Sequence, residues 1–118
     1  KSTTDFNGYF NTDKLQAISA GYNDMMTYVR KQTNSPQTTS GWFLPSIGQL
    51  IYIKKKYAEV ISKSFDKCGG AMGRGWQHHY WSSTEATAAN SYNINWDSGT
   101  YSQKNKSSGS MVRTALAF

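Results

Sequence analysis

The spacing of apolar residues changes partway along the chain, and this change restricts the possible folds more than any other feature. In three stretches before residue 68, apolar residues recur every three or four positions, as on one face of a helix. From Tyr80 onward they alternate with polar residues, as in strands with one buried face. Helices therefore come first and a mainly antiparallel sheet comes last, which predicts an α+β fold.

Two or three N-terminal helices are predicted. The first follows a turn-rich lead, is capped by Thr12 and ends before Pro36; its apolar positions are Leu15, Ile18, Tyr22, Met25 and Val29. A short strand over residues 41–46 follows. Ser46 and Gln49 then have the spacing of a capping box, which predicts a second helix that ends in three consecutive lysines. A third, short helix is expected over residues 58–67, with Ile61 and Phe65 buried.

Strands are predicted over residues 80–85, 92–97 and 112–118, with a hairpin turn at "DSG", residues 97–99. Because successive strand residues point to opposite faces, one face of the middle strand belongs to the core and the other is free to change. The core face carries Tyr92, Ile94 and Trp96, and the free face carries Asn93, Asn95 and Asp97.

The length of 118 residues predicts a single domain over residues 1–118. Hydrophobic residues make up 37% of the chain and aromatic residues 14%, so large rings are expected to supply much of the core. Only 17% of residues are charged, and the polar surface is mostly Ser, Thr, Asn and Gln. This balance is typical of extracellular or cell-surface modules rich in β-structure.

The net charge of +6 has two interpretations, solubility or an anionic partner. No basic stripe with regularly spaced stacking aromatics is present, so nucleic-acid binding is not expected. No apolar run is long enough to cross a bilayer, so membrane insertion is not expected either.

No catalytic pattern is found in the sequence. Cys68 is the only cysteine, which excludes an intrachain disulfide and a cysteine-type metal site. His78 and His79 are adjacent on a strand and therefore point to opposite faces, which favours structural or surface roles over a shared metal. No nucleophile elbow and no paired carboxylates occur. Neither an enzyme nor a cofactor or metal site is expected.

Three stretches, "GWFLPSIGQL", "YWSSTE" and "VRTALAF", together resemble the C-terminal domain of the Legionella collagen-like adhesin, which also occurs in surface, pilus-tip and phage receptor-binding proteins of gut Bacteroidales. The resemblance implies a C-type-lectin-like fold of the formylglycine-generating-enzyme type. It assigns scaffold roles, with Trp42 and Trp81 in the core and Arg113 paired with Glu85; the scaffold residues are Trp42, Leu44, Pro45, Trp81, Glu85 and Arg113.

The chain departs from two relatives of that fold. The Glu-Pro-Asn or Gln-Pro-Asp motif of calcium-dependent lectins is absent, and one cysteine cannot form the redox pair of formylglycine-generating enzymes. Calcium-dependent sugar binding is therefore not implied, while a structural calcium ion is left open.

The resemblance also implies a variable region, because Bacteroidales members of this family are frequent targets of diversity-generating retroelements. These systems mutate template adenines, and an AAC codon gives Ser, Thr, Asp, Tyr, Gly or Ala but not Lys, Gln, Met or Trp. Ser and Asn supply ten of the 26 positions in residues 86–111, which suits that origin. Gln103, Lys104, Lys106 and Met111 would then be fixed or differently encoded positions. The alternative is a polar hairpin on an ordinary surface module.

The resulting hypothesis is a non-enzymatic recognition module on the cell surface or at a phage tail fibre tip, which binds a cell-surface protein or glycan. A homotrimer is among the open oligomeric states. The expected ligand-binding residues are Trp76, Gln77, His78, His79, Asn90, Ser91, Asn93, Asn95, Asp97, Ser98, Thr100, Ser102, Gln103, Asn105, Ser107, Ser108 and Ser110. The alternative is an adhesin domain that binds sulfated polysaccharide through a basic helix carrying Lys54, Lys55, Lys56, Lys63 and Lys67.

Overall fold

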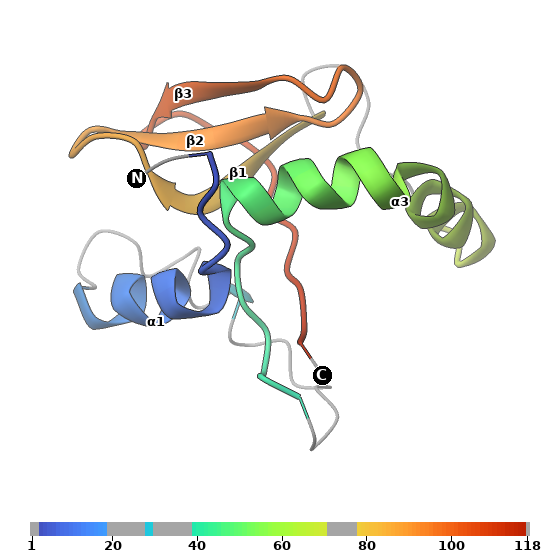
Figure 1. The fold of residues 1–118 in the computed structure, drawn as a ribbon, viewed down its shortest axis with the longest axis horizontal. Helices are drawn as coiled ribbons and strands as arrows, with labels where there is room; N and C mark the ends of the chain where they lie inside the picture. The colour runs from blue at the N-terminus through green and yellow to red at the C-terminus, as the bar shows by residue number, and fades with distance from the viewer. Residues whose placement is uncertain (1–2, 19–27, 30–38, 71–77, 118) are drawn as a thin grey trace.

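The computed structural model describes residues 3–18, 28–29, 39–70 and 78–117. In this part of the chain two helices precede three strands: α1 (Gly8–Ile18), α3 (Ile47–Lys67), β1 (His79–Glu85), β2 (Asn90–Asn95) and β3 (Tyr101–Asn105). The strands form an antiparallel sheet in the order β1-β2-β3. Helix α3 lies along the sheet, and β3 forms the sheet edge away from α1 (Figure 1). The predicted α+β order is confirmed.

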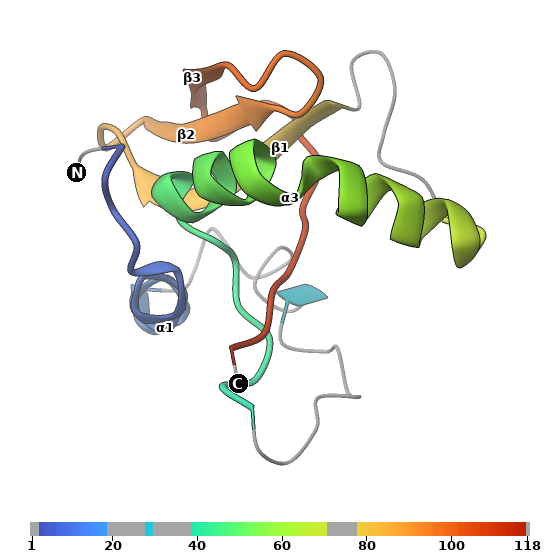
Figure 2. The same cartoon turned by 45° about the vertical axis from the view of Figure 1, so that its right-hand side comes forward.

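Helix α3 begins at the predicted capping box. The backbone N–H of Ser46 donates to Gln49 Oε1 at 2.9 Å, and Ser46 is the N-cap. The two helices expected over residues 47–67 form one continuous helix of 21 residues. Its one glycine, Gly48, lies in the first turn, and neither Gly nor Pro occurs between residues 49 and 67. Lys54 occupies the gap in the apolar face, with its Nζ 5.5 Å from the centre of the Trp96 ring. Ile61 and Phe65 are only half-buried, because the last turns of α3 extend beyond the sheet (Figure 2).

Helix α1 begins at Gly8, earlier than the predicted start at Thr12. Asp5 supplies the N-terminal contacts: its carboxylate accepts from the backbone N–H of Asn7 at 3.0 Å and from Asn11 Nδ2 at 2.7 Å. Thr12 therefore lies inside the helix, where its hydroxyl donates to the Gly8 carbonyl at 2.8 Å and accepts from the Leu44 N–H at 3.0 Å. Most of the remaining predicted helix, including Tyr22 and Met25, lies outside the described residues, although Val29 is buried.

The core lies between α3 and one face of the sheet. Its buried side chains are those of Ile47, Leu50, Tyr80, Ile94 and Trp96. The Tyr80 and Trp96 rings meet edge to face with centroids 6.1 Å apart, a favourable geometry for aromatic pairs. Of the two tryptophans assigned to the core, Trp81 is buried and Trp42 is half-buried.

Two stretches predicted as strands are extended but do not join the sheet as strands. Residues 41–46 and the C-terminal segment, residues 111–117, contact each other through one bridge, Phe43 with Ala115. The C-terminal segment touches the sheet through a second bridge, between Met111 and Tyr80, and then runs away from it beside residues 41–46 (Figure 1). Pro45 has no backbone N–H to continue a ladder. Burial does not alternate in either segment: residues 43–46 are all buried, and residues 111–116 are all half-buried.

Candidate ligand-binding surface

The β2–β3 hairpin, Asn90–Asn105 with its connecting turn, carries most of the expected ligand-binding residues. Strand β3 is exposed over four of its five positions. The turn that joins the strands uses Gly99 at φ 73, a left-handed conformation that favours glycine, so the predicted hairpin at residues 97–99 is confirmed. Seven of the expected residues are exposed here and just beyond: Asp97, Ser98, Thr100, Ser102, Gln103, Asn105 and Ser107.

A second group of expected residues is half-buried and makes internal hydrogen bonds. Ser91 Oγ donates to the Thr84 carbonyl at 2.9 Å, which ties β2 to β1. Asn95 Oδ1 accepts from the backbone N–H groups of Asp97 and Ser98 at 2.9 and 3.2 Å, which shapes the turn. This group comprises His79, Asn90, Ser91, Asn95, Ser108 and Ser110. Its members border the exposed surface and are less available to a ligand.

Two expected residues are buried, which corrects the predicted surface. Asn93 was assigned to the free face of its strand, yet it is 1% exposed. It lies directly opposite Trp81 on β1, and its Oδ1 accepts from Ser102 Oγ at 2.6 Å. Side chains directly opposite in a sheet are close neighbours, so the large Trp81 ring covers this position. The second face of the sheet is therefore not open along its whole length.

His78 is also buried, with its Nδ1 against the Asp97 carboxylate. The neighbouring residue His79 contacts Asn95 instead: His79 Nε2 lies 3.5 Å from Asn95 Nδ2. The pair therefore supports the start of the sheet and the hairpin turn. Burial makes His78 unavailable to a ligand, which corrects its predicted place on the binding surface. Trp76 and Gln77 lie outside the described residues.

The lysines expected to be fixed hold the ends of the hairpin. Lys104 Nζ donates to the Gly109 carbonyl at 2.5 Å and to Ser110 Oγ at 3.1 Å. Lys106 Nζ pairs with the Glu85 carboxylate and donates to the Ala88 carbonyl at 2.9 Å. Lys104 thus joins β3 to the segment that follows it, and Lys106 joins that segment to the turn between β1 and β2.

The predicted ion pair between Glu85 and Arg113 is wrong, because the Glu85 carboxylate pairs with Lys106. Arg113 instead lies against aromatic rings, with its Cζ 4.8 Å from the centre of Phe65 and 5.9 Å from the centre of Tyr80. Planar guanidinium groups stack well on such rings. Arg113 therefore packs against aromatic side chains of α3 and β1 and does not pair with Glu85.

A buried polar network, formed by Asp5, Ser46 and Thr84, joins the helices to the sheet. Thr84 Oγ1 donates to the Asp5 carboxylate at 2.9 Å and accepts from the Ile47 N–H at 3.0 Å. Ser46 Oγ donates to the Asp5 carbonyl at 2.6 Å. No local pattern in the sequence predicts this network, because its members are 38 to 79 positions apart and only the folded chain brings them together.

The basic helix does not present its lysines in one direction. Lys54 is half-buried against Trp96, whereas Lys55, Lys56 and Lys67 are exposed. Lys63 pairs with Glu59 one turn earlier, at 2.6 Å, and both groups are exposed. Such pairs contribute little to stability, about 0.3–0.5 kcal/mol, but Glu59 reduces the positive charge of this face.

Neither a metal site nor a membrane span is found in the parts of the chain that the structure covers. No group of three His, Cys, Asp or Glu side chains among residues 3–18, 28–29, 39–70 and 78–117 is placed to hold a metal ion. No described helix has the length and apolar character needed to cross a bilayer. Cys68 is exposed at the end of α3.

Fold and surface together define a small α+β domain with a polar hairpin at one edge of its sheet. Comparisons with protein families, with curated proteins and with solved structures find no significant match to this chain.

Proposed function

We propose that this domain is an extracellular ligand-recognition module on a C-type-lectin-like scaffold, and that it binds a cell-surface protein or glycan through the β2–β3 hairpin. One observation carries the proposal: seven expected contact residues are exposed along the edge strand β3 and its flanking turns, while β2 is held between β1 and β3 and packs on α3 through Ile94. The carrier would be a surface protein, a pilus or a phage tail fibre tip.

The chemistry of the exposed side chains suits recognition. Ser102, Asn105 and Ser107 offer small hydroxyl and amide groups, and Tyr101 adds a ring that is 49% exposed. Antibody loops use the same mixture, in which tyrosine supplies contact area and small polar residues supply adaptable hydrogen bonds. Binding would depend on surface complementarity and would involve no chemical step.

We further propose that residues 86–111 are the variable region of a diversity-generating retroelement protein. Of the four residues that were set apart because an AAC codon cannot produce them, three have structural contacts: Lys104 and Lys106 hold neighbouring turns, and Met111 exchanges two backbone hydrogen bonds with β1. The fourth, Gln103, is exposed on β3.

Among the exposed polar residues of the hairpin and its flanking turns, Asp97 contacts His78 and Ser102 donates to Asn93, whereas Ser98, Thr100, Asn105 and Ser107 make side-chain contacts with residues two positions away. Ser91, Asn93 and Asn95 have internal roles, so the variable positions would be fewer than the sequence suggested.

A binding experiment tests the recognition surface. The wild-type domain is screened on an array of glycans and cell-surface proteins, and the hits are measured again with Ser102, Gln103 and Asn105 all changed to Ala. We expect the affinity to fall at least about tenfold, because truncation of an important interface residue costs about 1 kcal/mol or more. The melting temperature should change by no more than about 4 °C.

The matched control is a triple charge reversal on α3, with Lys55, Lys56 and Lys67 changed to Glu. It should leave binding of the hits unchanged. If it abolishes binding, and binding also falls steeply with added salt, the sulfated-polysaccharide alternative is correct. Unchanged binding by the hairpin triple variant would contradict the proposed surface.

The variable-region proposal has a genomic test. The gene should be accompanied by a near-identical repeat that differs from it only where the template has adenine, beside a reverse transcriptase gene. A repeat without this adenine bias would contradict the proposal and leave the recognition surface untouched.

A further inference from the structure

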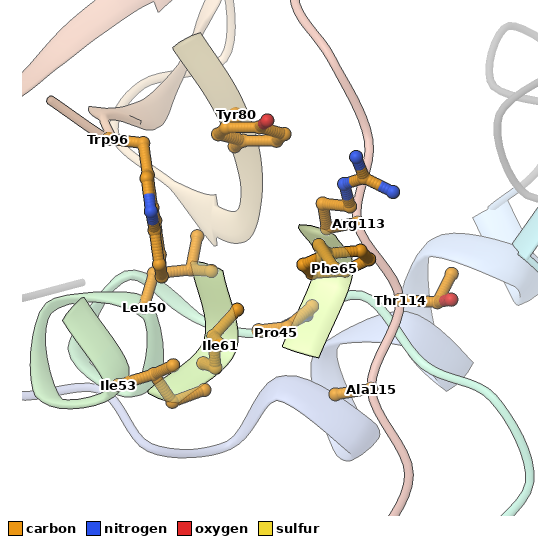
Figure 3. Close-up of a pocket in the computed structure, with 10 residues that line it drawn as sticks. All are labelled: Pro45, Leu50, Ile53, Ile61, Phe65, Tyr80, Trp96, Arg113, Thr114 and Ala115. Carbon is orange, nitrogen blue, oxygen red and sulfur yellow. The ribbon is translucent and has the colours of Figure 1, made fainter. Parts of the chain in front are cut away.

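The two edges of the sheet differ in whether their backbone groups are paired. The outer edge of β1 is covered, because Met111 makes two backbone hydrogen bonds with it and the Pro45 carbonyl accepts a third, at 2.8 to 2.9 Å. The C-terminal segment then continues along an apolar pocket beside α3, where Arg113 lies against Phe65 (Figure 3). At the opposite edge, no described element lies beyond β3 (Figure 1 and Figure 2).

Two hydrogen bonds show which residues of β3 direct their backbone groups outward. The Asn95 N–H donates to the Thr100 carbonyl at 2.7 Å, and the Lys106 N–H donates to the Ala89 carbonyl at 3.0 Å. Both bonds continue the β2–β3 register, one at each end of β3. Bonded and non-bonded pairs alternate in an antiparallel ladder. The even-numbered residues of β3 therefore direct their N–H and C=O groups toward β2, and the odd-numbered residues direct theirs outward.

The odd-numbered residues, Tyr101, Gln103 and Asn105, are all exposed. In the part of the chain that the structure describes, the backbone N–H and C=O groups of Tyr101 and Gln103 have no hydrogen-bond partner, and neither does the Asn105 N–H. The Asn105 carbonyl accepts from the Ser108 N–H at 2.9 Å, which forms the turn after the strand. The outer edge of β3 therefore offers alternating donors and acceptors to another molecule.

Strand β3 lacks the features that usually protect a sheet edge. Proteins often block such an edge with a proline, a β-bulge or a lysine. No proline occurs in β3, and its register with β2 is uninterrupted. Its one lysine, Lys104, is held by the Gly109 carbonyl and by Ser110 Oγ. The edge is therefore open to the addition of a further strand.

We infer that the ligand of the recognition surface is a protein that adds an extended segment of its chain to β3. This inference rests on the proposed function of the hairpin and specifies its partner. The outward groups recur every second residue, about 7 Å apart, and an extended peptide carries donors and acceptors at the same spacing. A second copy of this chain is a poorer match, because each copy has a net charge of +6 and the two would repel.

Strand addition explains how a surface of changing side chains retains its affinity. In such complexes main-chain hydrogen bonds supply affinity, and the side chains beside the added strand supply specificity. Substitution of Ser102 or Asn105 changes the side chains of β3 but leaves the outward backbone groups in place. The binding mode therefore persists while the preferred partner segment changes.

The probe for the test is a phage library of random peptides of about twelve residues, long enough to span β3 at about 3.4 Å per residue. It is selected on the whole wild-type domain, and the enriched peptides are then measured with two variants of one position. Gln103→Pro removes the outward N–H, and an edge strand tolerates proline where the N–H faces solvent. Gln103→Ala removes only the side chain and is the matched comparison.

The selected peptides should bind the Gln103→Pro variant at least about tenfold more weakly than the Gln103→Ala variant, equivalent to about 1.4 kcal/mol. Equal affinities for the two variants would overturn strand addition. A library from which no binding peptide is enriched would overturn it as well.

Hydrogen exchange in the wild-type domain is a second measurement that does not depend on the folding of a variant. In the free domain the Tyr101 and Gln103 amides should exchange fast, whereas the Ser102 and Lys104 amides, which are bonded to β2, should exchange slowly. A bound selected peptide should slow exchange at Tyr101 and Gln103 at least about tenfold. Unchanged exchange at these two amides would overturn the inference.

The possible outcomes separate this inference from the proposed function. If every ligand that depends on the hairpin side chains is a glycan, the recognition surface is supported and strand addition is wrong. If exchange at Tyr101 and Gln103 slows as the concentration of the domain alone is raised, a second copy occupies the edge and the protein partner is wrong. If ligands bind without the hairpin side chains, the proposed function itself is wrong.

Discussion

The buried Asp5–Ser46–Thr84 network and the β2–β3 hairpin both rely on hydroxyl, amide and carboxylate groups, but they connect very different parts of the chain. Thr84 is hydrogen-bonded to Asp5, 79 positions away, and Thr12 reaches Leu44, 32 positions away. In the hairpin, Ser98 contacts Thr100 and Asn105 contacts Ser107, each only two positions away.

This difference in range has a physical consequence. A buried group that loses its partner costs about 1–3 kcal/mol, because no water replaces the lost bond. An exposed group that loses a neighbour is hydrated again at little cost. The network should therefore be intolerant of substitution, and the exposed hairpin positions should be tolerant, as a recognition surface that changes its sequence requires.

The largest contrast is expected within one cross-strand pair, Ile94 and Tyr101. Ile94 is fully buried, so Ile94→Ala should lower the free energy of unfolding by about 3 kcal/mol through lost burial and a residual cavity. Tyr101 is 49% exposed, and Tyr101→Ala should cost only about 1 kcal/mol, mainly from its edge-to-face contact with Tyr92. Chemical denaturation measures the free energy of unfolding of both variants. Equal losses would contradict the expected difference between the buried and the exposed position.

The same substitution at two threonines separates buried from exposed polar groups. Thr84→Val preserves shape but removes the hydroxyl between Asp5 and the Ile47 N–H, and should cost about 2 kcal/mol. Thr100→Val removes only an exposed hydroxyl contact with Ser98 and should change stability by less than about 0.5 kcal/mol. Urea denaturation measures the free energy of unfolding of both variants. A loss for Thr84→Val as small as that for Thr100→Val would contradict the structural role of the network.

Gly99 is one hairpin position that should resist substitution. Its φ of 73 is unfavourable for alanine, so Gly99→Ala should cost about 1 kcal/mol from backbone strain. The space around it is not the reason, because an added Cβ would meet Lys54 side-chain carbons only at 3.6 and 3.7 Å. Gly109→Ala is the control, since an added Cβ there meets nothing within 4 Å. Equal thermal stabilities of the two variants would contradict this.

The smallest effect is expected at Lys106. Lys106→Ala removes the contact with Glu85 and should cost about 0.5–1 kcal/mol, because Glu85 is more than half exposed and solvent weakens the pair. The loss should shrink as salt is added. Lys55→Ala is the control, as an exposed helix lysine, and should change stability by less than about 0.5 kcal/mol. A loss that is independent of salt would show that Lys106 acts through packing instead.

The elements that the sequence predicted well are those whose signals are local. The capping box needs only Ser46 and Gln49, and the hairpin turn needs only residues 97–99. The start of α1 was missed because Asp5, and not Thr12, supplies the N-terminal contacts, and Asp5 is itself held by Thr84 on a distant strand.

The exposure of the predicted surface residues was only partly correct, because Asn93 and His78 are buried. Alternation along β2 identifies two faces, yet it does not show that Trp81 on the neighbouring strand covers Asn93. Likewise, alternation in residues 112–118 predicts a strand with one buried face, whereas the segment forms a single bridge with Phe43 and residues 112–116 are all half-buried. Lys104 and Lys106 could be recognised as exceptions to the codon pattern, whereas their contacts become visible only in the folded chain.

The most direct test of the central claim is a comparison of two displayed libraries under protease challenge. One library randomises Ser98, Thr100, Ser102, Gln103, Asn105 and Ser107. The other randomises the network residues Asp5, Ser46 and Thr84 together with three residues beside them, Asn11, Thr12 and Gln49. We predict that most hairpin variants remain within about 1 kcal/mol of the wild-type stability, whereas most network variants are cleaved. Similar fractions of folded variants in both libraries would contradict the claim that one region maintains the fold while the other is free to change.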